Sequence, residues 1–141
     1  MKLIAVNIRK FQSRDREMLI GLWRRVFADD PPHNEPSRML DAKLAVDDLM
    51  YIAEDEGGII GACRVGYDGH RGWLYAVAVS PRHRRSGAGS KLVAHAMQEL
   101  KKLGCIKVNI QIRSANREVA AFYKSLGFDI EDRLSLGAFI K

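Results

Sequence analysis

Residues 77–91 constrain the fold most, because their sequence predicts a strand, a tight turn and the start of a helix. The apolar run ends at Pro81, the basic run 82–85 follows, and Gly87 and Gly89 precede an amphipathic segment. Glycine has no Cβ and lets backbone N–H groups approach a ligand closely. The unpaired N–H groups and the positive dipole end of the helix face the same turn. The stretch therefore predicts a binding site for a phosphate or pyrophosphate group.

Two common phosphate-binding motifs do not fit this turn. A P-loop requires a glycine where Arg84 stands and a lysine where Ser90 stands. The dinucleotide-binding motif requires a third glycine at the position of Leu92. The sequence therefore favours neither a nucleoside triphosphate nor NAD. An ordinary strand, turn and helix with solvated arginines is the alternative interpretation.

Hydrophobic periodicity along the rest of the chain predicts one α/β domain over residues 1–141, with a mixed sheet. Glycine-marked turns separate the middle strands, and the helix after the basic run joins two strands that we expect to be parallel. The expected strands are 2–9, 49–54, 59–67, 73–79, 105–112, 128–131 and 134–140. The first expected helix begins after residue 13 and ends near residue 27. The other expected helices cover 37–46, 87–103 and 116–126.

The composition is that of a globular protein, with 28% charged and 47% hydrophobic residues in 141. No apolar run approaches the ~18 residues of a membrane span, and residues 1–9 lack the apolar region of a signal peptide. We therefore expect a cytoplasmic protein without a membrane partner. Cys63 and Cys105 lack metal-ligand spacing, so we expect buried hydrophobic residues and no metal. The net charge of +6 suits an anionic cofactor or a nucleic acid.

Two separated motifs resemble those of the GNAT (Gcn5-related) N-acetyltransferases. Residues 84–89 resemble the signature Arg/Gln-x-x-Gly-x-Gly/Ala, and residues 116–128 resemble Asn-x-x-x-Ala-x-x-Phe/Leu-Tyr-x-x-x-Gly-Phe. The order of expected elements, β-α-α-β-β-β-α-β-α-β-β, is similar to the GNAT acyl-CoA N-acyltransferase fold over nearly the whole chain. The resemblance implies a mixed sheet with a splayed parallel strand pair. Residues 67–72 and 134–137 are similar to small bacterial YpeA-type members.

The resemblance implies an acyltransferase that moves the acetyl group of acetyl-CoA, its cosubstrate, to a primary amine of a small molecule or a peptide. The splayed strand would pair with pantetheine, and a strand N–H near Val79 would stabilise the oxyanion. Asn116 would bond the pantetheine arm or act as a helix N-cap, or both. Tyr123 would be the general acid toward the leaving thiolate. The implied cofactor-binding residues are Val77, Ala78, Val79, Arg84, Arg85, Ser86, Gly87, Ala88, Gly89, Ser90 and Asn116.

The general base and the acceptor stay open at the level of the sequence. Gln111 occupies the position of a glutamate in the branch that acetylates ribosomal-protein N-termini, and an amide cannot take up a proton. Glu54, Asp68, His70 and a chain of water molecules are the alternatives. We expect an α-amine or a similarly weak amine, because its low pKa leaves part of it neutral at pH 7.

The acceptor pocket is expected near the first two helices, the loop 29–36 and the last strands. Asp29, Asp30, Glu35 and Asp41 either attract a cationic amine or form an ordinary solvated charge run. The alternatives to an enzyme are a non-catalytic acyl-CoA-binding sensor and a basic nucleic-acid-binding module. The sequence shows no groove-reading or stacked-aromatic motif, so we expect no nucleic-acid partner. The oligomeric state stays open, with a homodimer as one alternative.

Overall fold

The computed structural model describes residues 5–141 and divides into two compact units, the first ending at Ile110 and the second running from Gln111 to Lys141. The first unit holds the sheet strands β1 (Asn7–Lys10), β2 (Met50–Asp55), β3 (Gly58–Tyr67), β4 (Arg71–Val79) and β5 (Lys107–Ile110). Its helices are α1 (Arg16–Val26), α2 (Pro36–Val46) and α3 (Ala88–Lys102), with short 3-10 turns at Ser13–Asp15, Pro32–Asn34 and Pro81–His83. The second unit holds α4 (Arg117–Ser125). One domain over residues 1–141 stays a prediction.

The sheet follows the chain order β1-β2-β3-β4-β5. Short turns join β2 to β3 and β3 to β4. Strands joined in this way lie antiparallel to each other. The connection from β4 to β5 runs through α3, and these two strands are parallel. The observed mixed sheet with one parallel pair confirms the predicted fold class.

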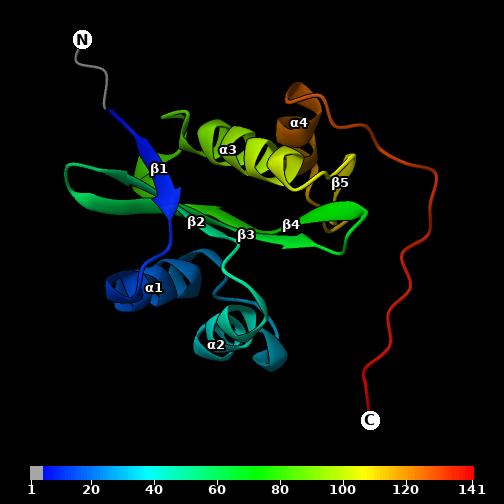
Figure 1. The fold of residues 1–141 in the computed structure, drawn as a ribbon, viewed down its shortest axis with the longest axis horizontal. Coiled ribbons are helices and arrows are strands. Elements are labelled where there is room, and N and C mark those ends of the chain that lie inside the picture. Colours follow the sequence, from blue (N-terminus) through cyan, green and yellow to red (C-terminus); the bar gives the residue numbers. More distant parts are fainter. Residues whose placement is uncertain (1–4) are drawn as a thin grey trace. The chain divides into compact units, whose positions relative to one another are not determined.

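Helices cover both faces of this sheet, α1 and α2 on one side and α3 on the other (Figure 1). The amphipathic pattern of α1 buries Leu19, Leu22 and Trp23 against sheet residues such as Ile52 and Ala62. Burying each such side chain stabilises the fold by about 1.5–3 kcal/mol. With α3 on the opposite face, this packing encloses β3 and β4 between helices.

The close packing of α3 depends on glycines of the sheet. A Cβ built on Gly61 would lie 2.9 Å from the backbone oxygen of Ala78 and 3.1 Å from Cδ1 of Leu92. Real Cβ atoms do not approach backbone oxygens so closely. Glycine at position 61 of β3 therefore allows both β4 and α3 to pack closely against this strand. This packing fixes where the turn between β4 and α3 begins.

The strand predictions are wrong at the C-terminal end of the chain. No helix or strand is formed in described residues 126–141, although strands are expected at 128–131 and 134–140. Ile130, Leu134, Leu136 and Phe139 are exposed. An alternating pattern specifies a strand only where one of its faces is buried, and here neither is. At the other end, the strand expected at 2–9 is observed from Asn7, and residues 2–4 of it lie outside the described residues.

The described part of the chain, residues 5–141, contains no helix that is long and apolar enough to cross a membrane. The same residues contain no group of three His, Cys, Asp or Glu side chains that could hold a metal ion. Cys63 is buried as expected, and burial raises the pKa of its thiol to about 12. Cys105 is only half-buried, which differs from the expectation.

Candidate functional site

Strand β4 continues beyond its parallel partner. The last pair of the β4–β5 register joins Leu74 to Ile110, so residues 75–79 have no strand on that edge within the first unit as described. Ser80 donates its N–H to a carbonyl of β3 at 2.7 Å. Because backbone groups alternate along a strand, the N–H and C=O of Val79 point to the opposite, unpaired edge. This edge can pair with a ligand that carries amide groups of its own.

A β-bulge lies within this unpaired edge, and sequence analysis missed it. The β3–β4 register is irregular between Ala62 and Arg64, so that Ala76 and Val77 together face Cys63. Ala76 has a φ of 47°, in the left-handed region that residues other than glycine rarely adopt. Bulges redirect the groups of a strand and are common beside active sites. No glycine or asparagine marks the position, so the sequence gives no local signal for it.

The turn after β4 contains two residues in left-handed backbone conformation. Arg85 has a φ of 68° and Gly87 a φ of 85°. Turns with such residues gather successive N–H groups around an anion-binding concavity. A Cβ built on Gly87 would meet no atom within 4 Å, so the backbone conformation, not lack of space, favours glycine here.

Helix α3 begins with N–H groups that its own backbone does not satisfy. The N–H of Ala88 donates to Oγ of Ser86 at 3.3 Å. The N–H groups of Gly89 and Ser90 lie in the first turn, where no earlier carbonyl of the helix can accept them. They are therefore available to an anion at the positive end of the helix dipole.

Three arginines precede these N–H groups in the turn. Arg82, Arg84 and Arg85 are exposed, and none of them forms an ion pair with a described residue. His83, between them, is held by Asp55, with Nε2 3.4 Å from the carboxylate oxygen. Unpaired guanidinium groups bind phosphate oxygens through forked N–H donors. The structure thus places the predicted residues in one turn at the start of α3, and their binding of a pyrophosphate stays a prediction.

The second unit contains the two predicted site residues that lie outside the turn. Asn116 accepts the N–H of Val119 on its Oδ1 at 3.2 Å, which confirms the N-cap interpretation. Tyr123 is only 4% exposed, and its ring lies edge-on to Phe122 and Phe128, with centroids 5.0 and 5.4 Å away. The roles of Asn116 and Tyr123 toward a cofactor stay predictions.

Two of the expected general bases are engaged elsewhere. Glu54 accepts hydrogen bonds from the Nε–H and a terminal N–H of Arg9, and these bonds lower the pKa of its carboxyl. Asp68 accepts the backbone N–H groups of Arg71 and His70 at 2.7 and 2.9 Å, which also lowers its pKa. A carboxylate with a lowered pKa is a weaker base. Among the alternatives, His70 and a chain of water molecules remain.

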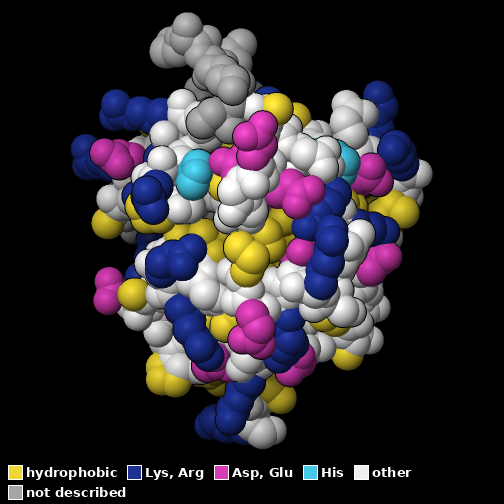
Figure 2. Space-filling view, turned by 90° about the vertical axis from the view of Figure 1, so that its left-hand side faces the viewer, with side chains coloured by type: hydrophobic (Ala, Val, Ile, Leu, Met, Phe, Trp, Pro, Cys, Tyr) yellow, Lys and Arg dark blue, Asp and Glu magenta, His cyan; other side chains and the backbone are white. Residues whose placement is uncertain are grey.

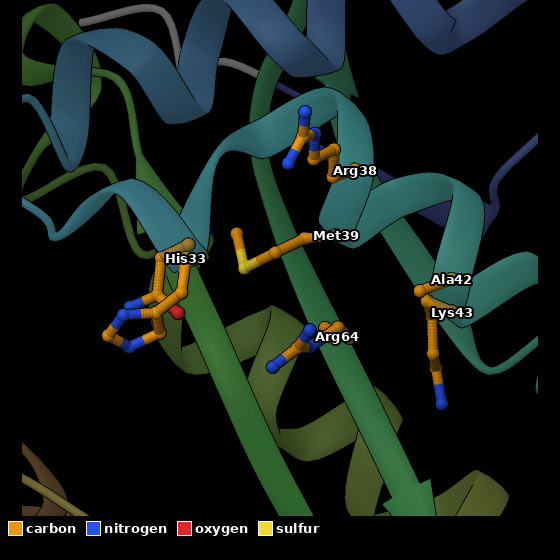
Figure 3. Close-up of a pocket in the computed structure, with 7 residues that line it drawn as sticks. His33, Arg38, Met39, Ala42, Lys43 and Arg64 are labelled. Atoms are coloured by element: carbon orange, nitrogen blue, oxygen red, sulfur yellow. The ribbon is translucent and has the colours of Figure 1, made fainter. Parts of the chain in front are cut away.

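A pocket of about 490 Å³ lies between α2 and β3 (Figure 3). Such a volume lies within the usual range of small-molecule sites. Its location at α2 agrees with the expected acceptor region. The labelled side chains that line it are His33, Arg38, Met39, Ala42, Lys43 and Arg64.

The acidic residues near the first helices do not line this pocket. Glu35 caps α2, accepting the N–H groups of Ser37 and Arg38 at 3.2 and 3.1 Å, and the bonds from Ser37 lower its pKa to about 2. Asp41 pairs with Arg16 on α1. These contacts give Glu35 and Asp41 partners within the fold, and attraction of a cationic amine by either residue stays a prediction.

Known proteins resemble this chain in sequence and structure. The model of the "Acetyltransferase (GNAT) family" matches residues 16–128. The acetyltransferase YE1169 of Yersinia enterocolitica is 36% identical over 133 residues, which cover 94% of each chain. The acetyltransferase SG1711 of Sodalis glossinidius is 35% identical over 132 residues, 93% of this chain and 92% of that one.

Two solved structures illustrate the shared fold. The structure of AAC(6')-Iy in complex with a bisubstrate analog, CoA-S-monomethyl-acetylneamine, has a TM-score of 0.79 at 18% identity and covers 97% of this chain and 99% of that chain. The ribosomal-protein-S18-alanine N-acetyltransferase of Escherichia coli has a TM-score of 0.78 at 22% identity, with 89% and 78% coverage. These likenesses confirm the expected fold.

Proposed function

The chain belongs to the acetyltransferase (GNAT) family, and we propose that it transfers the acetyl group of acetyl-CoA to a primary amine of a small molecule, with Tyr123 as the general acid. The prediction of an acetyl-CoA-dependent N-acetyltransferase is confirmed for the class of enzyme. The acceptor and the roles of individual residues described below are the proposal.

The observation that supports these roles is that the unpaired edge of β4 leads directly into the turn before α3. Coenzyme A is an extended ligand with amide groups and a diphosphate. Its amide groups fit the unpaired edge of β4, and its diphosphate fits the turn that follows. The backbone of Val77 and Val79 would pair with the pantetheine amides, with the buried Ala78 between them anchoring the strand in the core. The groups proposed for the pyrophosphate are the side chains of Arg84 and Arg85, the turn residue Ser86 and the backbone of Gly87, Ala88, Gly89 and Ser90.

The direction of the ligand follows from where the strands part. The last β4–β5 pair joins Leu74 to Ile110, and β4 continues without a strand partner on that edge of the first unit from Tyr75 to Val79, where the turn begins. With the pyrophosphate at the turn, the thioester end of the ligand reaches back along β4 toward Tyr75. The reacting atoms would then lie beside the bulge at Ala76, where backbone groups of β4 are redirected.

The reaction requires three contributions from the protein: stabilisation of the oxyanion, an acid for the leaving group and a neutral attacking amine. Acetyl-CoA supplies a thioester carbonyl for attack by a neutral amine, with the coenzyme A thiolate as leaving group. With the thioester beside the bulge, a backbone N–H of β4 near Ala76 would stabilise the charge that develops on the carbonyl oxygen, in place of the N–H near Val79 that the sequence resemblance implies. Tyr123 donates a proton to the leaving thiolate, the conjugate base of a thiol whose pKa is near ~8.5. Because Glu54 and Asp68 are engaged, an amine that is partly neutral at pH 7, such as an α-amine, needs the least help from a base.

Replacing Tyr123 by phenylalanine tests this assignment. We expect kcat to fall by about 10²–10⁴-fold, the contribution of a positioned general acid, while KM for acetyl-CoA changes little. Thiol release from acetyl-CoA with a panel of amines is the measurement. Tyr51→Phe is the matched control, since the Tyr51 hydroxyl is buried without a hydrogen-bond partner among the described residues and its loss should leave kcat unchanged. Equal turnover in wild type and Tyr123→Phe would remove Tyr123 from the mechanism.

The alternatives predict different results in the same assay. Tight binding of acetyl-CoA with no thiol release for any amine would favour a non-catalytic acyl-CoA-binding sensor. A nucleic-acid-binding module requires a concentrated basic surface. On the face drawn in Figure 2, Lys and Arg side chains are interspersed with Asp and Glu, which does not support that alternative. The homodimer, the cytoplasmic location and the YpeA-type subgroup stay predictions.

A further inference from the structure

We propose that the pocket between α2 and β3 selects acceptor amines that also carry an anionic group, a carboxylate or a phosphate, and that Arg64 binds this group. The inference rests on the proposed function, because it names the class of acceptor for the same reaction. It concerns a part of the chain that neither of the two sequence motifs includes.

Arg64 is a half-buried cation without a counter-charge. It lies on the same face of β3 as Ala62, which packs in the core shared with α1 and α2. No carboxylate among the described residues pairs with it, and its Nε is buried without an acceptor. Burial lowers the pKa of Arg64, yet arginine stays protonated in proteins. Removing a cation from water without a partner is costly, so a bound anion at this position would be strongly favoured.

Tyr75 orients the guanidinium group without neutralising it. The Cζ atom of Arg64 lies 4.7 Å from the centroid of the Tyr75 ring, a cation–π contact. Trp73 in turn stacks beside Tyr75, with ring centroids 6.5 Å apart. An aromatic ring carries no formal charge, so this contact leaves the N–H donors of the guanidinium group without a counter-ion. The aromatic pair therefore prepares Arg64 to donate two parallel hydrogen bonds to a carboxylate or a phosphate.

The other groups of the pocket add positive charge. The charge of Lys43 is neutralised within the fold, because its ammonium group lies 2.7 Å from a carboxylate oxygen of Asp47. The ammonium group also donates a hydrogen bond to the carbonyl of Val65. Arg38 is exposed and forms no side-chain ion pair with a described residue. In Figure 3, the side chains of Met39 and Arg64 extend toward His33, while Lys43 points elsewhere. No Asp or Glu lines the described pocket, so its uncompensated charges, Arg38 and Arg64, both favour an anion.

The location of Arg64 suits an acceptor rather than the cosubstrate. Its register partner on β4 is Tyr75, which directly follows the last β4–β5 pair at Leu74. This is where the β4–β5 pairing ends and where the proposed function places the thioester. The pyrophosphate has its own arginines in the turn after Val79. An amine on a small molecule whose anionic group is bound by Arg64 would therefore lie close to the thioester.

Matched pairs of amines test the proposal on the wild-type protein. Phosphoethanolamine is compared with ethanolamine, and β-alanine with its carboxamide, by thiol release from acetyl-CoA. We expect KM to be at least about 10-fold lower for the charged member of one pair, the effect of one hydrogen-bonded charged contact. The pair with the larger ratio distinguishes a phosphate from a carboxylate. Equal KM values within both pairs would overturn the proposal without any variant.

Two variants locate the effect. Arg64→Gln should raise KM for the charged amine, so that the ratio of KM values within each pair falls to about one. Arg16→Gln removes an arginine that pairs with Asp41 outside the pocket, and it should preserve the preference. Loss of the preference in both variants, or in neither, would contradict the assignment to Arg64.

A binding measurement separates this inference from the proposed function. Phosphoethanolamine and ethanolamine are titrated into wild type without acetyl-CoA, and the NMR signals of the Arg64 and His33 side chains are followed. We expect shifts with phosphoethanolamine only. Equal shifts, or none at millimolar concentration, would overturn the anion site whatever the enzyme's turnover. Conversely, absence of thiol release with every amine would contradict the proposed function while the titration still reports on the anion site.

Discussion

Two half-buried arginines of the sheet, Arg9 on β1 and Arg64 on β3, have opposite surroundings. Arg9 donates to both oxygens of Asp15 at 2.7 and 2.8 Å and to Glu54 at 3.0 Å, and these carboxylates raise its pKa. Arg64 has no carboxylate partner among the described residues, and burial lowers its pKa. The charge of Arg9 is used within the fold, whereas that of Arg64 is available to a ligand. Partners, rather than burial or residue type, thus distinguish a structural arginine from a binding one.

The largest expected contrast is in stability. Arg9→Gln should lower the free energy of unfolding by about 3 kcal/mol, because it leaves the Asp15 side chain, 5% exposed, without its charged partner. Arg64→Gln should lower it by less than about 1 kcal/mol, since no described carboxylate loses a partner. Urea unfolding followed by circular dichroism measures both. Similar losses in the two variants would remove the distinction between them.

The pH dependence of stability should sharpen the same contrast. The hydrogen bonds from Arg9 lower the pKa of Asp15 in the folded protein. Its contribution is therefore fully present above the unfolded pKa of ~3.9 and is lost as the pH falls through the folded pKa. Asp15→Asn should cost about 1.5–3 kcal/mol at pH 7, and progressively less below pH 4. Urea unfolding from pH 7 to pH 3 checks this.

Arg64→Gln provides the comparison for that titration. No described carboxylate pairs with Arg64, so the stability difference between this variant and wild type should stay constant from pH 7 to pH 3. A constant difference for Asp15→Asn, or a pH-dependent one for Arg64→Gln, would contradict the account.

The smallest expected effect is at the exposed arginines of the turn. Arg85→Gln should raise KM for acetyl-CoA by about 2–5-fold, the effect of one solvent-exposed charge pair, and added salt should reduce the difference. Lys101→Gln, an exposed charge at the other end of α3, is the control and should not change KM. A salt-independent effect at Arg85, or an equal effect at Lys101, would mean that the turn does not act through direct charge contacts.

The two proposed binding regions also differ in how far the sequence predicts them. The turn is contiguous, so Arg84, Gly87 and their neighbours could be identified from spacing, and the left-handed φ of Gly87 explains why glycine is favoured there. The pocket is formed by α2 and β3, which are far apart in the sequence. Its only local signal is a charged residue, Arg64, within an otherwise apolar strand.

The sheet could be predicted where short turns and hydrophobic periodicity agree, and not where burial decides the outcome. β2, β3 and β4 follow from glycine-marked turns between apolar runs. The bulge at Ala76 depends on the register with β3, which the sequence of β4 alone does not determine. Residues 128–140 have a strand-like pattern, but Leu134 and Leu136 are exposed, so the pattern has no buried face.

Backbone hydrogen exchange with and without acetyl-CoA tests the central claim most directly, because the proposed contacts are mainly backbone N–H groups. We predict that the cosubstrate slows exchange at Val77 and Val79 on the unpaired edge of β4, and at Gly89 and Ser90 at the start of α3. Unchanged exchange at all four amides with millimolar acetyl-CoA, or protection confined to other residues, would contradict the account.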